Sequence, residues 1–152
     1  MLELPHTLVG AVIATRISEP LVSLPLAFLS HFWLDVIPHW NPNLYTEKLV
    51  HGRPLKKSAE LVAADTLVSL GAGSFFAWRF WPDWQRIIII YLACFLAVVP
   101  DVIEGLYFFA GVNSRFLVWL VKFQRSIQGK AGKKLGLAIQ LMTIILALVL
   151  LK

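Results

Sequence analysis

The chain has 152 residues, of which 58% are hydrophobic and only 15% charged, and its mean hydropathy is +0.71. This composition excludes a soluble domain and predicts one integral membrane domain, residues 1–152, with several helices that face lipid. The net charge of +5 indicates contact with anionic lipid head groups and no nucleic-acid partner, because the basic residues lie in short loops between apolar segments. A single cysteine, Cys94, excludes an internal disulfide and a thiolate cluster, which leaves nitrogen and oxygen atoms as metal ligands.

Proline, glycine and charge divide the chain into apolar segments and connections. In chain order, these are expected at residues 5–16, 20–38, 39–58 (a polar loop), 58–81, 84–110, 114–127 and 133–151. The first segment is too short to cross a bilayer alone, since a span needs about 20 residues, so it is tilted, incomplete or re-entrant. The segment 114–127 alternates aromatic and basic side chains, which favours a helix at the membrane surface. The predicted fold class is all-α, a polytopic transmembrane helical bundle with about four to five membrane segments plus a short surface helix.

Basic residues gather in two connections and predict the orientation of the chain. The first connection contains Lys48, Arg53, Lys56 and Lys57, and the second contains Arg115, Lys122, Arg125, Lys130, Lys133 and Lys134. The positive-inside rule therefore places both connections in the cytoplasm. At ~1.5 Å per helical residue, Asp35, Asp65 and Asp101 then lie roughly 5 to 13 Å from the cytoplasmic ends of their segments. His6 begins its segment on the same side, so residues from four segments are expected in one layer inside the cytoplasmic face.

Seven ionisable residues lie in or against strongly apolar segments, where each costs several kcal/mol unless it is paired, bound to a metal or facing water. They are His6, His31, Asp35, His39, Asp65, Asp101 and Glu104. His31 and Asp35 are one helical turn apart and share a face. Imidazole and carboxylate without thiolate suit a divalent ion, with zinc as the expected metal and manganese or iron as alternatives. Glu104 shares a face with Asp101 and is either a further ligand or a general base, the role that we expect.

These residues also have structural interpretations without a metal. His39, next to Trp40, could be an interfacial histidine, and the aspartates could belong to a buried polar network that fixes helix packing.

A family resemblance follows from the pattern HxxxDxxPH between His31 and His39, the opening Pro5-His6-Thr7-Leu8-Val9-Gly10, the isolated Asp65 and the pair Pro100-Asp101. Over about residues 5–105 the chain resembles the YdjM-like membrane-bound metal-dependent hydrolases of bacteria and archaea, which are distantly similar to zinc-dependent phospholipase C. The resemblance implies a helical membrane fold with His6, His31, Asp35, His39, Asp65 and Asp101 as metal ligands. The chain lacks the Asp-rich turn of many relatives and the larger histidine set of the soluble phospholipases, so one or two ions are expected in place of three.

The function expected from these observations is hydrolysis of an ester or phosphoester in a lipid-like substrate, near the cytoplasmic leaflet of a prokaryotic cytoplasmic membrane. Lys48, Arg53, Lys56 and Lys57 would hold an anionic group of this lipid. Two alternatives are a metal-ion carrier and a noncatalytic scaffold with a structural metal, and a protein partner or a homo-oligomer fits either one. A transport path needs polar residues at successive depths, yet the outer halves of the spans offer only Ser23, Ser69, Ser74 and Thr15. This pattern favours an enclosed site.

Overall fold

The computed structural model describes all 152 residues, and it is all-helical, as predicted. Its seven helices are α1 (Glu3–Arg16), α2 (Pro20–Val36), α3 (Leu44–His51), α4 (Lys56–Trp78), α5 (Trp84–Phe108), α6 (Arg115–Ile127) and α7 (Lys133–Leu150). An isolated bridge between His39 and Lys130 joins two of the connections.

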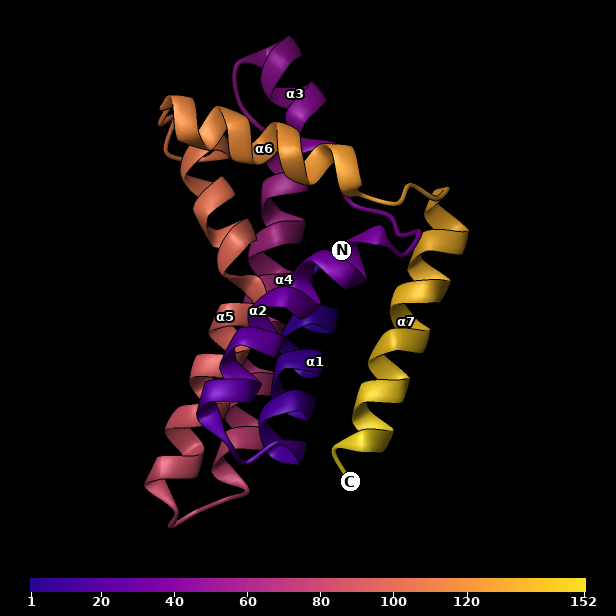
Figure 1. Ribbon diagram of the computed structural model, residues 1–152. Helices are drawn as coiled ribbons and strands as arrows, with labels where there is room; N and C mark the ends of the chain where they lie inside the picture. The colour runs from indigo at the N-terminus through magenta and orange to yellow at the C-terminus, as the bar shows by residue number, and fades with distance from the viewer.

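Helix α1 lies at the centre of the bundle, although it is one of the shorter helices. It packs against α2, α4, α5 and α7, while α6 packs on α5 and α2. Figure 1 shows α6 running across one end of the bundle, with α3 beyond it and the turn between α4 and α5 at the opposite end. The start of α1, the end of α2 and the end of α5 therefore meet beneath α6.

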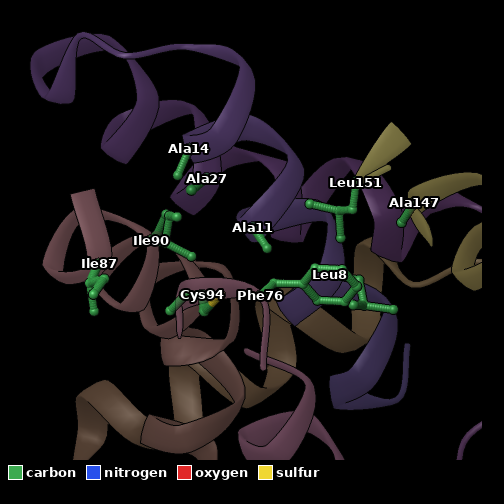
Figure 2. Close-up of a cluster of buried hydrophobic side chains, with 12 residues drawn as sticks. Leu8, Ala11, Ala14, Ala27, Phe76, Ile87, Ile90, Cys94, Ala147 and Leu151 are labelled. Atoms are coloured by element: carbon green, nitrogen blue, oxygen red, sulfur yellow. The ribbon is translucent and has the colours of Figure 1, made fainter. Parts of the chain in front are cut away.

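A cluster of buried apolar side chains holds the centre of the bundle together. Leu8, Ala11 and Ala14 of α1 pack with residues of α5, and residues of α2, α4 and α7 complete the cluster (Figure 2). Much of this contact is made by small residues, which let helix backbones approach closely. One close approach between helices is at Gly10, where an added Cβ would lie 2.7 Å from the carbonyl oxygen of Ala93. Gly10 thereby sets how near α1 comes to α5.

Three helices, α4, α5 and α7, are long and apolar enough to cross a membrane. Only 22%, 33% and 17% of their apolar windows are buried inside the protein, so most of that surface is left for lipid. Helix α2 is apolar but has 17 residues, and α1 has 14. The number of membrane segments, four to five, therefore stays a prediction.

Two boundaries differ from those predicted. Helix α2 ends at Val36, because Pro38 disfavours a helical conformation of the preceding Ile37, which is extended at φ −67° and ψ 132°. The stretch 39–58, expected to be a loop, contains the eight-residue helix α3. This expectation was wrong because local capping outweighs the polar composition: the side chain of Asn43 accepts from the backbone N–H of Thr46, and Gly52 ends the helix at φ 74°.

We expect Gly10→Val to destabilise the protein, because the added side chain collides with the backbone of α5 at Ala93. Overpacking of this kind costs about 1–3 kcal/mol. The matched control is Gly71→Val on α4, where an added Cβ meets no atom within 4 Å. Thermal unfolding in detergent checks this, and equal melting temperatures for the two variants would contradict the close approach.

Candidate metal centre

Three helices bring two histidines and a carboxylate together beneath α6. His6 comes from the first turns of α1, His31 from the last turns of α2 and Asp101 from the last turns of α5. One ligand atom of each lies within 4.8 Å of the others, and both histidines are fully buried. These three residues form a group that could hold a metal ion.

His6 has a buried ring whose nitrogens form no hydrogen bond, although Nε2 lies 3.4 Å from Oδ1 of Asp35. The ring stacks on that of His31, with the ring centroids 4.3 Å apart. A buried polar nitrogen without a partner is destabilising by about 1–3 kcal/mol, so a native imidazole is rarely left in this state. A metal ion bonded to His6 would satisfy one of these nitrogens, and the donor set therefore fits a divalent cation.

The ring of His31 is oriented from both sides. Its Nδ1 lies 2.9 Å from the carbonyl oxygen of Ala97, which fits an N–H that donates to this oxygen. Its Nε2 then faces the carboxylates of Asp35 and Asp101, with an oxygen of each 3.7 Å away. The Oε1 atom of Gln124, from α6, lies 2.8 Å from the same nitrogen. A backbone carbonyl on Nδ1 is the usual arrangement of a histidine that binds a metal through Nε2, and metal binding here requires the oxygen of Gln124 to turn away from Nε2.

Asp35 is fully buried at the centre of a wider network. Its Oδ1 lies 3.4 Å from Nε2 of His6 and 3.7 Å from Nε2 of His39, and the amino group of Met1 contacts the same oxygen. On the other side, Gln128 Nε2 donates to Oδ2 over 3.3 Å. In a tetrahedral site with bonds of about 2.0–2.2 Å, ligand atoms stand roughly 3.3–3.6 Å apart. The spacing around Asp35 is close to that separation.

Three of the six expected ligands lie outside the group of three: Asp35, His39 and Asp65. His39 is in the connection after α2, where its Nδ1 faces the carbonyl oxygen of Ile37 at 2.8 Å, and burial lowers the pKa of its ring. The neutral imidazole favoured by this shift is the form that binds metals. Asp65, on α4, accepts a hydrogen bond from the backbone N–H of Glu3. The structure thus places His39 against Asp35, and Asp65 at the start of α1.

A cavity of about 400 Å³ lies next to the group of three, and Asp101 forms part of its wall. Asp65 and Glu104 also line it, together with aromatic residues that include Phe108 and Phe109. Glu104 is buried, and its Oε1 has no hydrogen-bond partner. The expected base therefore lies in the same cavity wall as Asp101.

Some residues of the site were not expected from the sequence. Gln124 is buried beside His31, and Gln128 contacts Asp35. A signal for Gln124 existed: it shares the spacing of Leu117, Leu120 and Val121, the buried face of α6. A polar residue at the fourth position of an apolar stripe indicates an interior polar partner.

The basic residues assigned to an anionic group lie elsewhere. Lys56 pairs with Glu60, and Lys48 lies over the ring of Tyr107. None of Lys48, Arg53, Lys56 and Lys57 lines the cavity.

Comparisons with protein-family models, curated proteins and solved structures find no match for this chain. What the protein does must therefore be argued from the geometry of this site.

We expect His31→Ala to remove most bound zinc while the protein still inserts into membranes, because the substitution deletes a ligand and leaves the apolar segments intact. Gln124→Ala should also retain zinc, because the side chain of Gln124 faces the nitrogen of His31 that would bind the ion and does not contact the N–H that orients the ring. His51→Ala, in the exposed end of α3, is the control and should retain zinc. Elemental analysis of the purified proteins measures all three, and stoichiometric zinc in His31→Ala would refute the site.

Proposed function

We propose that the protein is a membrane-embedded, metal-dependent hydrolase that cleaves an ester or phosphoester of a lipid-like substrate. The supporting observation is that Asp101 belongs both to the buried group with His6 and His31 and to the wall of the cavity. A structural zinc site is closed by four protein ligands, whereas a catalytic site keeps a position open to water or substrate. A ligand exposed to a cavity supports the second arrangement.

Zinc is the metal that we propose, with His6 and His31 as nitrogen ligands and Asp101 as the oxygen ligand, which leaves the fourth position of a tetrahedral site open. A zinc ion held there would supply a Lewis acid for the activation of water and the polarisation of the ester. Glu104 accepts the proton of the attacking water as the new bond to phosphorus or to the acyl carbon forms. Glu104 then donates the same proton to the oxygen of the leaving alcohol as the ester bond breaks. The unpartnered Oε1 of Glu104 supports this role.

The resemblance to the YdjM-like hydrolases supports the same reaction class, and the arrangement of the helices supports a place for it. We propose that α2 crosses the membrane with α4, α5 and α7, and that α1 is a fifth, mostly enclosed segment. Both basic connections then lie in the cytoplasm of a prokaryotic cell, with α6 along the membrane surface. Exposed Phe116, Trp119 and Phe123 on α6 would lie among the lipid head groups.

Glu104→Gln should keep zinc and lower hydrolysis about 10²–10⁴-fold, because the amide keeps the shape of the side chain but cannot accept the proton. Glu60→Gln, on the exposed side of α4, is the control. Zinc content and turnover are measured on one preparation with a panel of membrane phospholipids. Unchanged turnover would remove Glu104 from the mechanism, and zinc-loaded unmodified protein that hydrolyses no lipid would favour a structural metal.

The orientation has its own test. In a Cys94→Ser background, a cysteine at Val50, an exposed position of α3, should react with an impermeant maleimide only after the cells are opened. Labelling of intact cells would place the site on the outer side.

A further inference from the structure

The cavity beside Asp101 is lined by side chains of both charges. Four acidic residues line it, and two basic ones, Arg125 at the end of α6 and Lys130 in the following connection, complete the wall. The acidic residues are Glu3, Asp65, Asp101 and Glu104. The basic pair requires an explanation, because Arg125 and Lys130 could neutralise these carboxylates and do not.

Neither basic residue forms an ion pair. The only ion pair of a lysine or arginine side chain in the protein joins Lys56 to Glu60, at 3.7 Å. The guanidinium carbon of Arg125 lies 4.3 Å from the ring centroid of Tyr45, which also lines the cavity. Stacking on an aromatic ring fixes the plane of a guanidinium and leaves its N–H fork free for an oxyanion.

Lys130 is held in place by its backbone neighbours. Gly129 N–H donates to the carbonyl oxygen of Asp35 over 2.7 Å, and Ala131 N–H donates to that of His39 over 3.0 Å. These bonds tie the connection after α6 to the segment that carries two of the expected ligands. The position of Lys130 relative to the metal centre therefore follows from the backbone.

We propose that Arg125 and Lys130 form the anion subsite of this cavity and bind the phosphate ester anion of the substrate. The proposal rests on the hydrolase function proposed above and narrows its substrates to phosphate esters. An oxyanion between the basic pair and the metal centre provides a negatively charged partner for both. An uncharged ester leaves the stacked guanidinium of Arg125 without such a partner. The apolar residues Val62, Phe108 and Val121 provide a wall for the attached glycerol and the first carbons of a chain.

The size of the cavity agrees with this ligand. About 400 Å³ is within the range of small-ligand sites, roughly 300–1,000 Å³, and suits a head group better than an entire lipid. The chains of a lipid would extend out of the cavity.

The test is equilibrium binding by calorimetry to zinc-loaded protein in dodecyl maltoside. The probes are dihexanoyl phosphatidic acid, dihexanoylglycerol without the phosphate, and glycerol 3-phosphate without the chains. We expect the phosphatidic acid to bind, and the double variant Arg125→Gln/Lys130→Gln to weaken this binding about tenfold or more. The control Lys122→Gln/Lys134→Gln removes the same charge from two exposed lysines outside the cavity and should bind within about twofold of the unmodified protein.

The possible outcomes test the anion subsite separately from the hydrolysis reaction. Equal binding of dihexanoylglycerol and the phosphatidic acid to the unmodified protein overturns the proposal without any variant, and so does equal loss in the two double variants. Glycerol 3-phosphate that binds as tightly as the phosphatidic acid supports the subsite and makes the ligand a soluble phosphate ester. Binding that depends on Arg125 and Lys130 but is followed by no turnover supports the subsite and rejects hydrolysis.

Discussion

The fully buried carboxylate of Asp35 is the constraint on which this end of the protein depends. A charge without a partner in such a place is destabilising by several kcal/mol, so positive or hydrogen-bonding groups must surround it. They come from four parts of the chain: Met1 and His6, His31, His39, and Gln128. Because no single helix can supply them, compensating the charge of Asp35 requires α1, α2 and the connection after α6 to pack together.

Close backbone contacts make this convergence possible. Gly10 lets α1 lie directly against Ala93, and one turn further along α5 the carbonyl oxygen of Ala97 meets Nδ1 of His31. Gly129 makes an even closer approach to the backbone of Val36 and Ile37, where a Cβ could not fit. Glycines at these two positions align helices and connections around the charged centre, and the polar contacts then orient individual rings.

The sequence predicts contacts that depend on spacing within one helix. It does not predict contacts between elements that are distant in the chain. His31 and Asp35 are four residues apart, which predicts a shared helix face, and the structure has their side chains 3.7 Å apart on α2. Helix class and the long apolar segments follow from composition in the same way. The contact of Gln124 with His31 could not be predicted, because the face of α6 that carries Gln124 meets α2 only through the crossing of α6 over the bundle. Lys130 lies at the cavity because of backbone hydrogen bonds of its neighbours, and such bonds leave no recognisable pattern in the sequence.

The acidic and basic residues that line the cavity connect the candidate metal centre with the proposed anion subsite. The four carboxylates that line the cavity repel an anion on their own, and a divalent ion at Asp101 would reverse this local field. Arg125, which has no carboxylate partner, attracts the same anion with or without the metal. Metal binding and anion binding should therefore be coupled, since each reduces the electrostatic cost of the other, and the coupling must be the same in both directions. A metal with only a structural role would not explain why Arg125 and Lys130 lie near four acidic side chains and yet have no carboxylate partner.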